Sequence, residues 1–282
     1  MLIDFHTHIF PESIRTQRQR YCTDDPAFGL LYASAKSRMV GADQLIAQMD
    51  TYGVDKAVTF GFPWCSPSTT KLHNDYIVEA VARYPDRLIG FCCVDPMQPQ
   101  APGEVERCLE AGLSGIGELA FYCSEFDCSD LGSMDEIMTL ASRFDCPVMI
   151  HTNEPVGHVY PGKTSNTLAQ IYAFVKKHPN NRLVLAHWGG GIFWYNLMKK
   201  EVRDVLRNVW FDTAASPFLY RPDIYRLALE LTGPDKILLG TDYPLLSVQR
   251  YIEEMRQAGL TENDTQNICY RNALALLKLK PE

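Results

Sequence analysis

Short apolar runs alternate along the chain with segments in which apolar residues recur three and four positions apart. Each run is apolar throughout, which is typical of parallel strands that helices cover on both faces. We predict eight strands, at about residues 2–5, 54–60, 87–94, 115–119, 147–150, 182–186, 208–211 and 236–239. The segments between them predict amphipathic helices, so the chain is interpreted as a series of βα units.

The helical segments show the expected spacing of apolar residues and the expected ends. We predict helices around residues 45–49, 77–84, 137–144, 168–175, 224–231 and 248–255. Glycines that could end a helix in the left-handed conformation follow at positions 53, 112, 233 and 259. These ends support the division into βα units.

Eight βα units in 282 residues predict a (β/α)8 barrel that forms a single domain over residues 1–282. An open, doubly wound sheet is the alternative. The barrel is favoured because only a closed sheet makes the first and eighth strands neighbours, which lets the polar residues at their ends meet. The connection over residues 9–42 is longer than most βα loops and is predicted to be a lid over the barrel mouth.

Composition narrows the class of protein. A hydrophobic content of 46% supports a sizeable core, and a net charge of -7 argues against nucleic-acid and anionic-membrane surfaces. No apolar run approaches the ~20 residues of a membrane span, and we expect no signal peptide, because the first predicted strand begins at Leu2. The nine scattered cysteines show no paired spacing, which predicts a reducing, cytoplasmic location without a disulfide framework. We expect a small-molecule substrate and, by default, a homodimer.

Side chains that can bind a metal follow several of the predicted strands. His6 and His8 are two residues apart on the first strand, so they project from the same face. His151, His187 and Asp242 follow three later strands. The carboxyl ends of the strands meet at one face of a barrel, where active sites lie. Imidazole and carboxylate ligands suit zinc or another first-row divalent ion, so the sequence predicts a metalloenzyme.

Such a centre would activate water. A bound metal lowers the pKa of its water to about 7. A neighbouring Asp can take up the proton and return it to a leaving group. A further His can polarise a carbonyl group or hold an oxyanion.

Four motifs and a C-terminal segment resemble the amidohydrolase superfamily, in the amidohydrolase-2 branch that includes the aminocarboxymuconate-semialdehyde decarboxylase-like enzymes. They are residues 4–8 (DFHTH), His151, residues 186–191 (AHWGGG), residues 240–244 (GTDYP) and residues 270–273 (YRNA). The resemblance spans essentially the whole chain. The ordered set of motifs is specific, although each motif alone is not.

The resemblance implies a ligand set and two catalytic residues. The implied metal ligands are His6, His8, His151 and Asp242. Asp242 would also be the proton shuttle. His187 would polarise the substrate, or bind metal if two ions are present. One Zn²⁺ is the first expectation, and a second ion, Mn²⁺ or Fe²⁺ are the alternatives.

The fourth strand departs from one familial pattern. Superfamily members with a carbamate-bridged metal pair carry a Lys at the end of this strand, whereas this chain has Glu118. Glu118 could bind a metal, as a carboxylate there does in the TatD-like branch, or only form hydrogen bonds nearby. The number of metal ions stays open.

Residues in the loops at the strand ends could contact the substrate. The candidates are Glu154, His158, Tyr160, Lys163, Trp64 and Trp188. The first four lie in a loop rich in proline, glycine and polar residues, which is typical of a binding loop. Alternatively, they bond to one another and only fix that loop, and Trp64 only covers the barrel top. Asp212 is predicted to orient a metal ligand rather than to bind the metal.

Three functions are compatible with these residues. The leading hypothesis is a metal-dependent hydrolase of a C–N, C–O or similar acyl bond in a small molecule. The alternative is a non-oxidative decarboxylase with the same metal ligands, which should place cations for a substrate carboxylate; Lys163 and the basic cluster at residues 15–20 are the candidates. A non-catalytic metal-binding protein is less favoured, because structure alone does not require this complete set.

Overall fold

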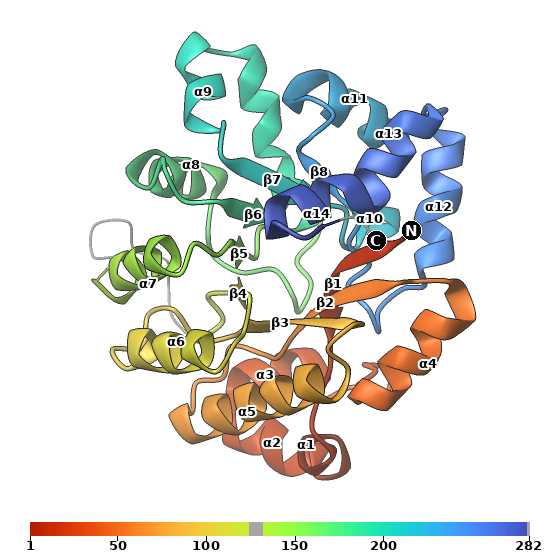
Figure 1. Cartoon of the computed structure of the whole chain (residues 1–282). Helices are drawn as coiled ribbons and strands as arrows, with labels where there is room; N and C mark the ends of the chain where they lie inside the picture. Colours follow the sequence, from red (N-terminus) through yellow and green to blue (C-terminus); the bar gives the residue numbers. More distant parts are fainter. Residues whose placement is uncertain (124–131, 281–282) are drawn as a thin grey trace.

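Eight parallel strands form one sheet in the order β1 to β8, with helices around it (Figure 1). The computed structural model describes residues 1–123 and 132–280. The strands are β1 (Ile3–His8), β2 (Lys56–Phe60), β3 (Leu88–Cys92), β4 (Gly115–Leu119), β5 (Val148–Ile150), β6 (Leu183–Leu185), β7 (Val209–Asp212) and β8 (Ile237–Leu238). Each overlaps a predicted run, so all eight predicted strands are confirmed.

The first strand closes the barrel by pairing with the chain that follows the eighth. The Phe5 amide donates to the Leu239 carbonyl over 2.7 Å, and the His8 amide donates to the Tyr243 carbonyl over 2.8 Å. This pairing confirms the (β/α)8 barrel over the open sheet.

Helices connect successive strands on the outside of the barrel. They are α4 (Ala42–Tyr52), α5 (Pro67–Arg83), α6 (Ala101–Glu110), α7 (Gly132–Arg143), α8 (Leu168–Lys177), η1 (His187–Leu197), α9 (Lys200–Val205), α10 (Ser216–Leu219), α11 (Asp223–Thr232), α12 (Val248–Gln257), α13 (Glu262–Gln266), η2 (Asn267–Arg271) and α14 (Asn272–Leu277). The six predicted stripes lie in α4, α5, α7, α8, α11 and α12. Among the described residues, no helix combines the length and apolar character needed to cross a membrane.

The core has an inner and an outer layer. Alternate strand residues point into the barrel, where Phe5 and Phe91 meet edge to face at 5.8 Å, while the others pack against the helices. Burial on both sides explains why the strands are apolar throughout. Leu274 of α14 joins the inner layer, so this helix covers one end of the barrel.

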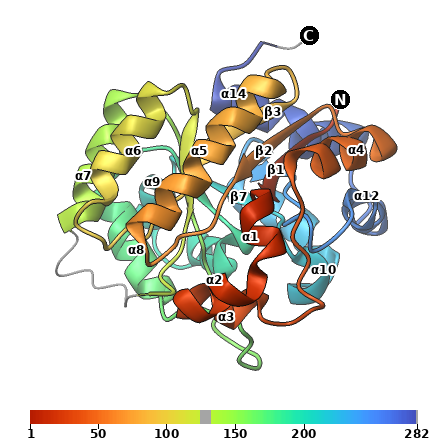
Figure 2. The ribbon, with the colours of Figure 1, turned by 90° about the horizontal axis from the view of Figure 1, so that it is seen from below.

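The segment between β1 and α4 is helical and packs as a unit. It contains α1 (Glu12–Thr16), α2 (Arg18–Asp24) and α3 (Pro26–Tyr32), and Figure 2 shows α2 and α3 at the opposite end of the molecule from α14. Phe10 and Phe28 of this segment pack with Phe62 and Trp64, which follow β2. This aromatic group covers the barrel end at which β1 finishes.

A disulfide joins two of the loops at this end. Cys65, after β2, is bonded to Cys123, after β4, across 58 residues of sequence. The Cys65 amide also donates to the Asp25 carboxylate, which caps α3. The sequence predicted no disulfide, because the two cysteines have no paired spacing and meet only when β2 and β4 enter the same barrel.

Candidate active site

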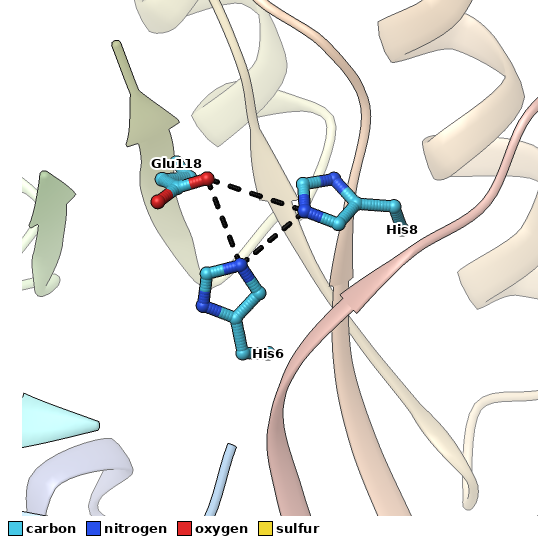
Figure 3. Close-up of side chains that lie close together, drawn as sticks. All are labelled: His6, His8 and Glu118. Carbon is cyan, nitrogen blue, oxygen red and sulfur yellow. Dashed lines mark hydrogen bonds and ion pairs between the residues drawn. The ribbon is translucent and has the colours of Figure 1, made fainter. Parts of the chain in front are cut away.

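Strand β1 directs two histidines to the same point, as its two-residue period predicts. The Nε2 atoms of His6 and His8 lie 3.3 Å apart. The Oε2 atom of Glu118, on β4, lies 3.6 Å from the Nε2 atom of His6 and 4.0 Å from that of His8. Figure 3 shows the three side chains converging from the two strands.

Closure of the barrel adds Asp242 to this group. Its Oδ1 atom lies 3.3 Å from the Nε2 atom of His8 and 3.6 Å from that of His6. The neighbouring Thr241 is fixed by Asp4, whose carboxylate accepts hydrogen bonds from the Thr241 amide and hydroxyl. The end of β1 and the segment after β8 therefore hold the carboxylate of Asp242 beside the imidazoles of His6 and His8.

Glu118 separates this group from a second pair of histidines. Its Oε1 atom lies 2.9 Å from the Nδ1 atom of His151 and 3.3 Å from the Nε2 atom of His187. These two nitrogens are 3.1 Å apart. The structure thus brings every predicted ligand to one centre, but it places His151 across Glu118 from His6 and His8.

Hydrogen bonds to the outer ring nitrogens orient the histidines. A carbonyl oxygen only accepts, so His8 and His187 donate from Nδ1 to the carbonyls of Gly61 and Ala214, each over 3.1 Å. His6 turns its Nδ1 atom to Asp212 at 2.8 Å. In each ring, Nε2 is consequently the atom that faces the centre.

His151 has the opposite orientation because of Asn153. The side-chain oxygen of Asn153 lies 3.1 Å from the Nε2 atom of His151, while its nitrogen donates to Thr164 and Asn166. His151 therefore donates from Nε2 and presents Nδ1 to Glu118. The sequence analysis did not identify Asn153, although its position two residues after His151 was a usable signal.

The carboxylates and histidines strongly perturb one another. Burial would lower the pKa of His6, but Glu118 and Asp212 outweigh it and raise this pKa to about 10. Burial also opposes the charged form of His187, yet its contact with Glu118 raises the pKa to about 9. The same histidines hold the pKa of Glu118 well below its usual value, despite burial. Without metal, His6 and His187 therefore carry protons at neutral pH, and Glu118 is ionised.

The donor set fits a divalent transition metal. Three overlapping groups each keep their ligand atoms within 4.8 Å of one another: His6, His8 and Glu118; His6, His187 and Asp242; and Glu118, His151 and His187. A mixture of imidazole nitrogens and carboxylate oxygens suits Mn²⁺, Fe²⁺ or Zn²⁺. Metal binding at His6 would displace the proton that its Nε2 atom carries.

The predicted binding loop after β5 mainly contacts itself. Glu154 accepts from the Tyr160 hydroxyl over 2.9 Å and from Lys163 over 3.0 Å. His158 is exposed, and its ring lies 6.1 Å from that of Tyr160. These contacts agree with the alternative in which the loop residues hold one another.

The two tryptophans proposed for substrate contact lie in packed surroundings. Trp64 is 1% exposed, and its indole donates to the Nδ1 atom of His73 over 3.0 Å. Trp188 is 0% exposed and packs edge to face against Tyr225 at 4.9 Å. Trp64 also lines a surface pocket together with Pro67 and Gln98, and substrate contact by either tryptophan stays a prediction.

The family follows from a match over nearly the whole chain. Residues 3–279 match the family model described as amidohydrolase. The chain belongs to the amidohydrolase family. It is an enzyme of this superfamily, as the motifs and the barrel predicted.

Two curated proteins with sequence similarity to this chain are decarboxylases. A gamma-resorcylate decarboxylase of Rhodococcus jostii is 26% identical over 250 residues, which cover 73% of this chain and 75% of that protein. A 2-amino-3-carboxymuconate-6-semialdehyde decarboxylase of Dictyostelium discoideum is 25% identical and covers 99% of this chain and 92% of its own length.

A solved structure shares the fold. The 5-carboxyvanillate decarboxylase of Novosphingobium aromaticivorans, with bound manganese, superimposes with a TM-score of 0.78 at 18% identity, covering 99% of this chain and 97% of its own.

The prediction that this amidohydrolase is a hydrolase is wrong. The two curated relatives and the solved structure described above are decarboxylases, so the comparisons favour the decarboxylase alternative. The error has a chemical reason. Hydrolysis and decarboxylation need the same metal ligands, so the residues that bind the metal do not identify which bond of the substrate breaks. The expected divalent metal agrees with the donor set, but the ion in the similar structure is manganese rather than zinc.

Proposed function

We propose that this amidohydrolase is a metal-dependent, non-oxidative decarboxylase of a small carboxylated aromatic or enolic compound. The observation that carries the proposal is the convergence of His6, His8, Glu118 and Asp242 at the barrel mouth, in a chain whose relatives decarboxylate such compounds. The rival interpretation, a non-catalytic metal-binding protein, does not require His187 and Asp242 to flank the same centre.

The chain offers ligands for a divalent ion, with Mn²⁺ favoured over Zn²⁺. His6 and His8 would bind through Nε2, Asp242 and Glu118 through carboxylate oxygens, and His151 through Nδ1. When bound, the ion would supply positive charge that holds an anionic substrate and stabilises the electron pair left by carbon dioxide. One ion is the simplest occupancy, although Glu118 also faces the second pair of histidines.

Two residues would act on the substrate. Decarboxylation breaks the bond from carbon to carboxylate, releases carbon dioxide and leaves an electron pair that a proton must meet. Asp242 is ionised at rest, so it would first take up a proton from solvent and then pass it to the carbon; its side chain is 20% exposed, whereas that of Glu118 is 8% exposed. His187, with a pKa raised to about 9, keeps a proton at neutral pH and would donate a hydrogen bond to a substrate oxygen.

Burial of the centre supports a reaction that excludes water. His6 is 0% exposed and Glu118 is 6% exposed, beneath the helices α1–α3. Excluded water strengthens electrostatic interactions in the site and limits side reactions of the carbanion-like species.

The test is direct measurement of carbon dioxide. Manganese-loaded protein would be incubated in D₂O with gamma-resorcylate and with 5-carboxyvanillate. We expect one carbon dioxide for each decarboxylated product, one deuterium at the former carboxyl position, and loss of turnover in Asp242→Asn. Asp204→Asn, on the exposed face of α9, is the matched control. Failure to release carbon dioxide from any carboxylated aromatic or enolic acid by fully metal-loaded protein would reject the proposal.

A further inference from the structure

The cations that the sequence offered for a substrate carboxylate bind elsewhere in the protein. Lys163 donates to Glu154, while Arg15 and Arg18 donate to backbone carbonyls within the segment between β1 and α4. These three side chains stabilise the loops around the centre. An anionic substrate therefore needs other groups to recognise the part that projects away from the metal ligands.

A continuous row of rings leads from the segment between β1 and α4 to the metal ligands. The ring centroids of Tyr32 and Phe62 are 6.0 Å apart, and Phe62 is stacked on Tyr122 at 5.7 Å with an interplanar angle of 5°. Tyr122 lies 5.8 Å from the ring of His151. Tyr122, in the loop after β4, thus borders the centre directly, and Tyr32 of α3 is joined to it through Phe62.

Packing holds the ring of Tyr32 in place. It stacks on Phe28 at 4.7 Å, and Phe10 meets it edge to face at 5.1 Å. Phe10 is two residues beyond His8, so this contact connects α3 to the end of β1. The ring is consequently prepositioned, which reduces the entropy lost when its hydroxyl binds a ligand.

The hydroxyl groups of both tyrosines are available as donors. Neither forms a hydrogen bond to another residue in the part of the chain that the structure describes, and both side chains are partly exposed. Burial raises the pKa of each phenol, and the charges of Asp242 and Glu118 raise it further. The two hydroxyls therefore lie within the field of the metal-binding carboxylates and keep their protons.

We propose that Tyr32 and Tyr122 form a clamp for a planar aromatic acid, in which both hydroxyls donate hydrogen bonds to the substrate carboxylate and the rings border its flat face. The proposal rests on the decarboxylase function and narrows its substrate class to aromatic acids. Neutral donors suit this position, because a phenol binds an anion without bringing a cation close to the metal. Aromatic rings and a few placed hydroxyls are also the usual lining of small-molecule sites.

The test compares Tyr32→Phe and Tyr122→Phe in the manganese-loaded protein. Each variant keeps its ring and removes only the hydroxyl. Tyr21→Phe, whose ring lies 5.8 Å from Trp64, is the matched control in α2. The probes are 2,6-dihydroxybenzoate and resorcinol, which differ by the carboxylate, with binding measured by calorimetry and metal content measured in the same samples.

We expect each clamp variant to bind 2,6-dihydroxybenzoate about 10- to 100-fold more weakly, as for loss of a hydrogen bond to a charged group. The resorcinol affinity and the metal content of the clamp variants should each change by less than about twofold. The affinity of the Tyr21→Phe control for 2,6-dihydroxybenzoate should also change by less than about twofold, because no contact to the ligand is lost. Unchanged acid binding in both clamp variants, or loss of metal from them, would overturn the clamp and leave the decarboxylase proposal standing. If the metal-loaded wild type bound neither this acid nor 5-carboxyvanillate, the decarboxylase substrate class would fall together with the clamp.

Discussion

The Nδ1 atom of His6 lies 2.8 Å from the Oδ2 atom of Asp212, and both side chains are fully buried. The other oxygen of Asp212 accepts from the amides of His187 and Ala214. One carboxylate therefore orients the first metal-binding histidine and fixes the chain that carries His187.

Asp212→Asn should weaken metal binding without unfolding the barrel. The one acceptor oxygen of Asn would stay with the amides of His187 and Ala214, so its NH2 group would face His6 and could not accept the Nδ1 proton. The ring would then lose the partner that fixes its orientation and turns Nε2 towards the metal. We expect a loss of about 10- to 100-fold in metal affinity, measured by chelator competition. Asp204→Asn should leave the affinity unchanged. Equal affinities in the two variants would show that the contact between Asp212 and His6 does not orient a ligand.

Glu118→Gln should lower the metal content, because Glu118 faces both pairs of histidines. Elemental analysis of wild type, Glu118→Gln and the exposed control Glu110→Gln would measure it. We expect less than one ion per chain in Glu118→Gln and wild-type content in the control. If the wild type holds two ions per chain and Glu118→Gln holds one or none, Glu118 lies between the two ions. Full occupancy in Glu118→Gln would contradict its role as a ligand.

Metal affinity should rise with pH. The pKa values of about 10 for His6 and about 9 for His187 mean that both rings are protonated in the metal-free protein at neutral pH. Metal binding must displace the proton that His6 carries on Nε2, so raising the pH from about 6 towards 9 favours the bound state by up to about tenfold per unit. Titrations across this range should also release protons into a weakly buffered solution. An affinity independent of pH would contradict the protonated centre.

Reduction of the disulfide should destabilise the folded state. The bridge between Cys65 and Cys123 spans 58 residues, so its loss should lower the free energy of unfolding by about 2–4 kcal/mol. The measurement is urea unfolding of wild type, the double variant Cys65→Ser/Cys123→Ser and the control Cys22→Ser. Labelling of unfolded protein should reveal two more thiols after reduction than before. An unchanged thiol count would mean that the bridge does not form in solution.

Gly190→Ala should disrupt the site. Gly190 has a φ of +59°, and a Cβ atom there would lie 2.1 Å from the carbonyl oxygen of Asn153. The clash would displace the residue that orients His151, so we expect lost metal binding and a destabilisation of several kcal/mol. Gly103→Ala, within α6 and with no atom within 4 Å of the added Cβ, should stabilise the protein by about 0.5–1 kcal/mol. Wild-type stability in Gly190→Ala would contradict the close approach seen here.

Local pattern determined much of the fold. Continuous apolar runs and helical stripes depend on neighbours in sequence, and they placed all eight strands. The two-residue period of β1 put His6 and His8 on one side, and the order of strands required Asp242 to join them if the sheet closed. These relationships were predictable because strand geometry and barrel order follow from the sequence of elements alone.

Relationships between distant segments needed the tertiary structure. The sequence did not show that Glu118 lies between two pairs of histidines or that Asn153 turns the Nδ1 atom of His151 inward. It also did not show the bridge from Cys65 to Cys123. Each depends on the register and loop paths of separate βα units, which no local pattern specifies.

The function, like the fold, was determined partly by the sequence and partly by the tertiary structure. The sequence by itself determined the barrel and a metal-binding residue set, because few residue types bind a first-row metal and the strand ends bring them together. It did not distinguish hydrolysis from decarboxylation, for which the comparisons were needed. The tertiary structure decided what surrounds that set: an ionised Glu118, a buried centre, and the hydroxyls of Tyr32 and Tyr122, which have no hydrogen-bond partner among the described residues. Substrate recognition depends on the positions of loops packed from distant parts of the chain, so it becomes visible only after folding.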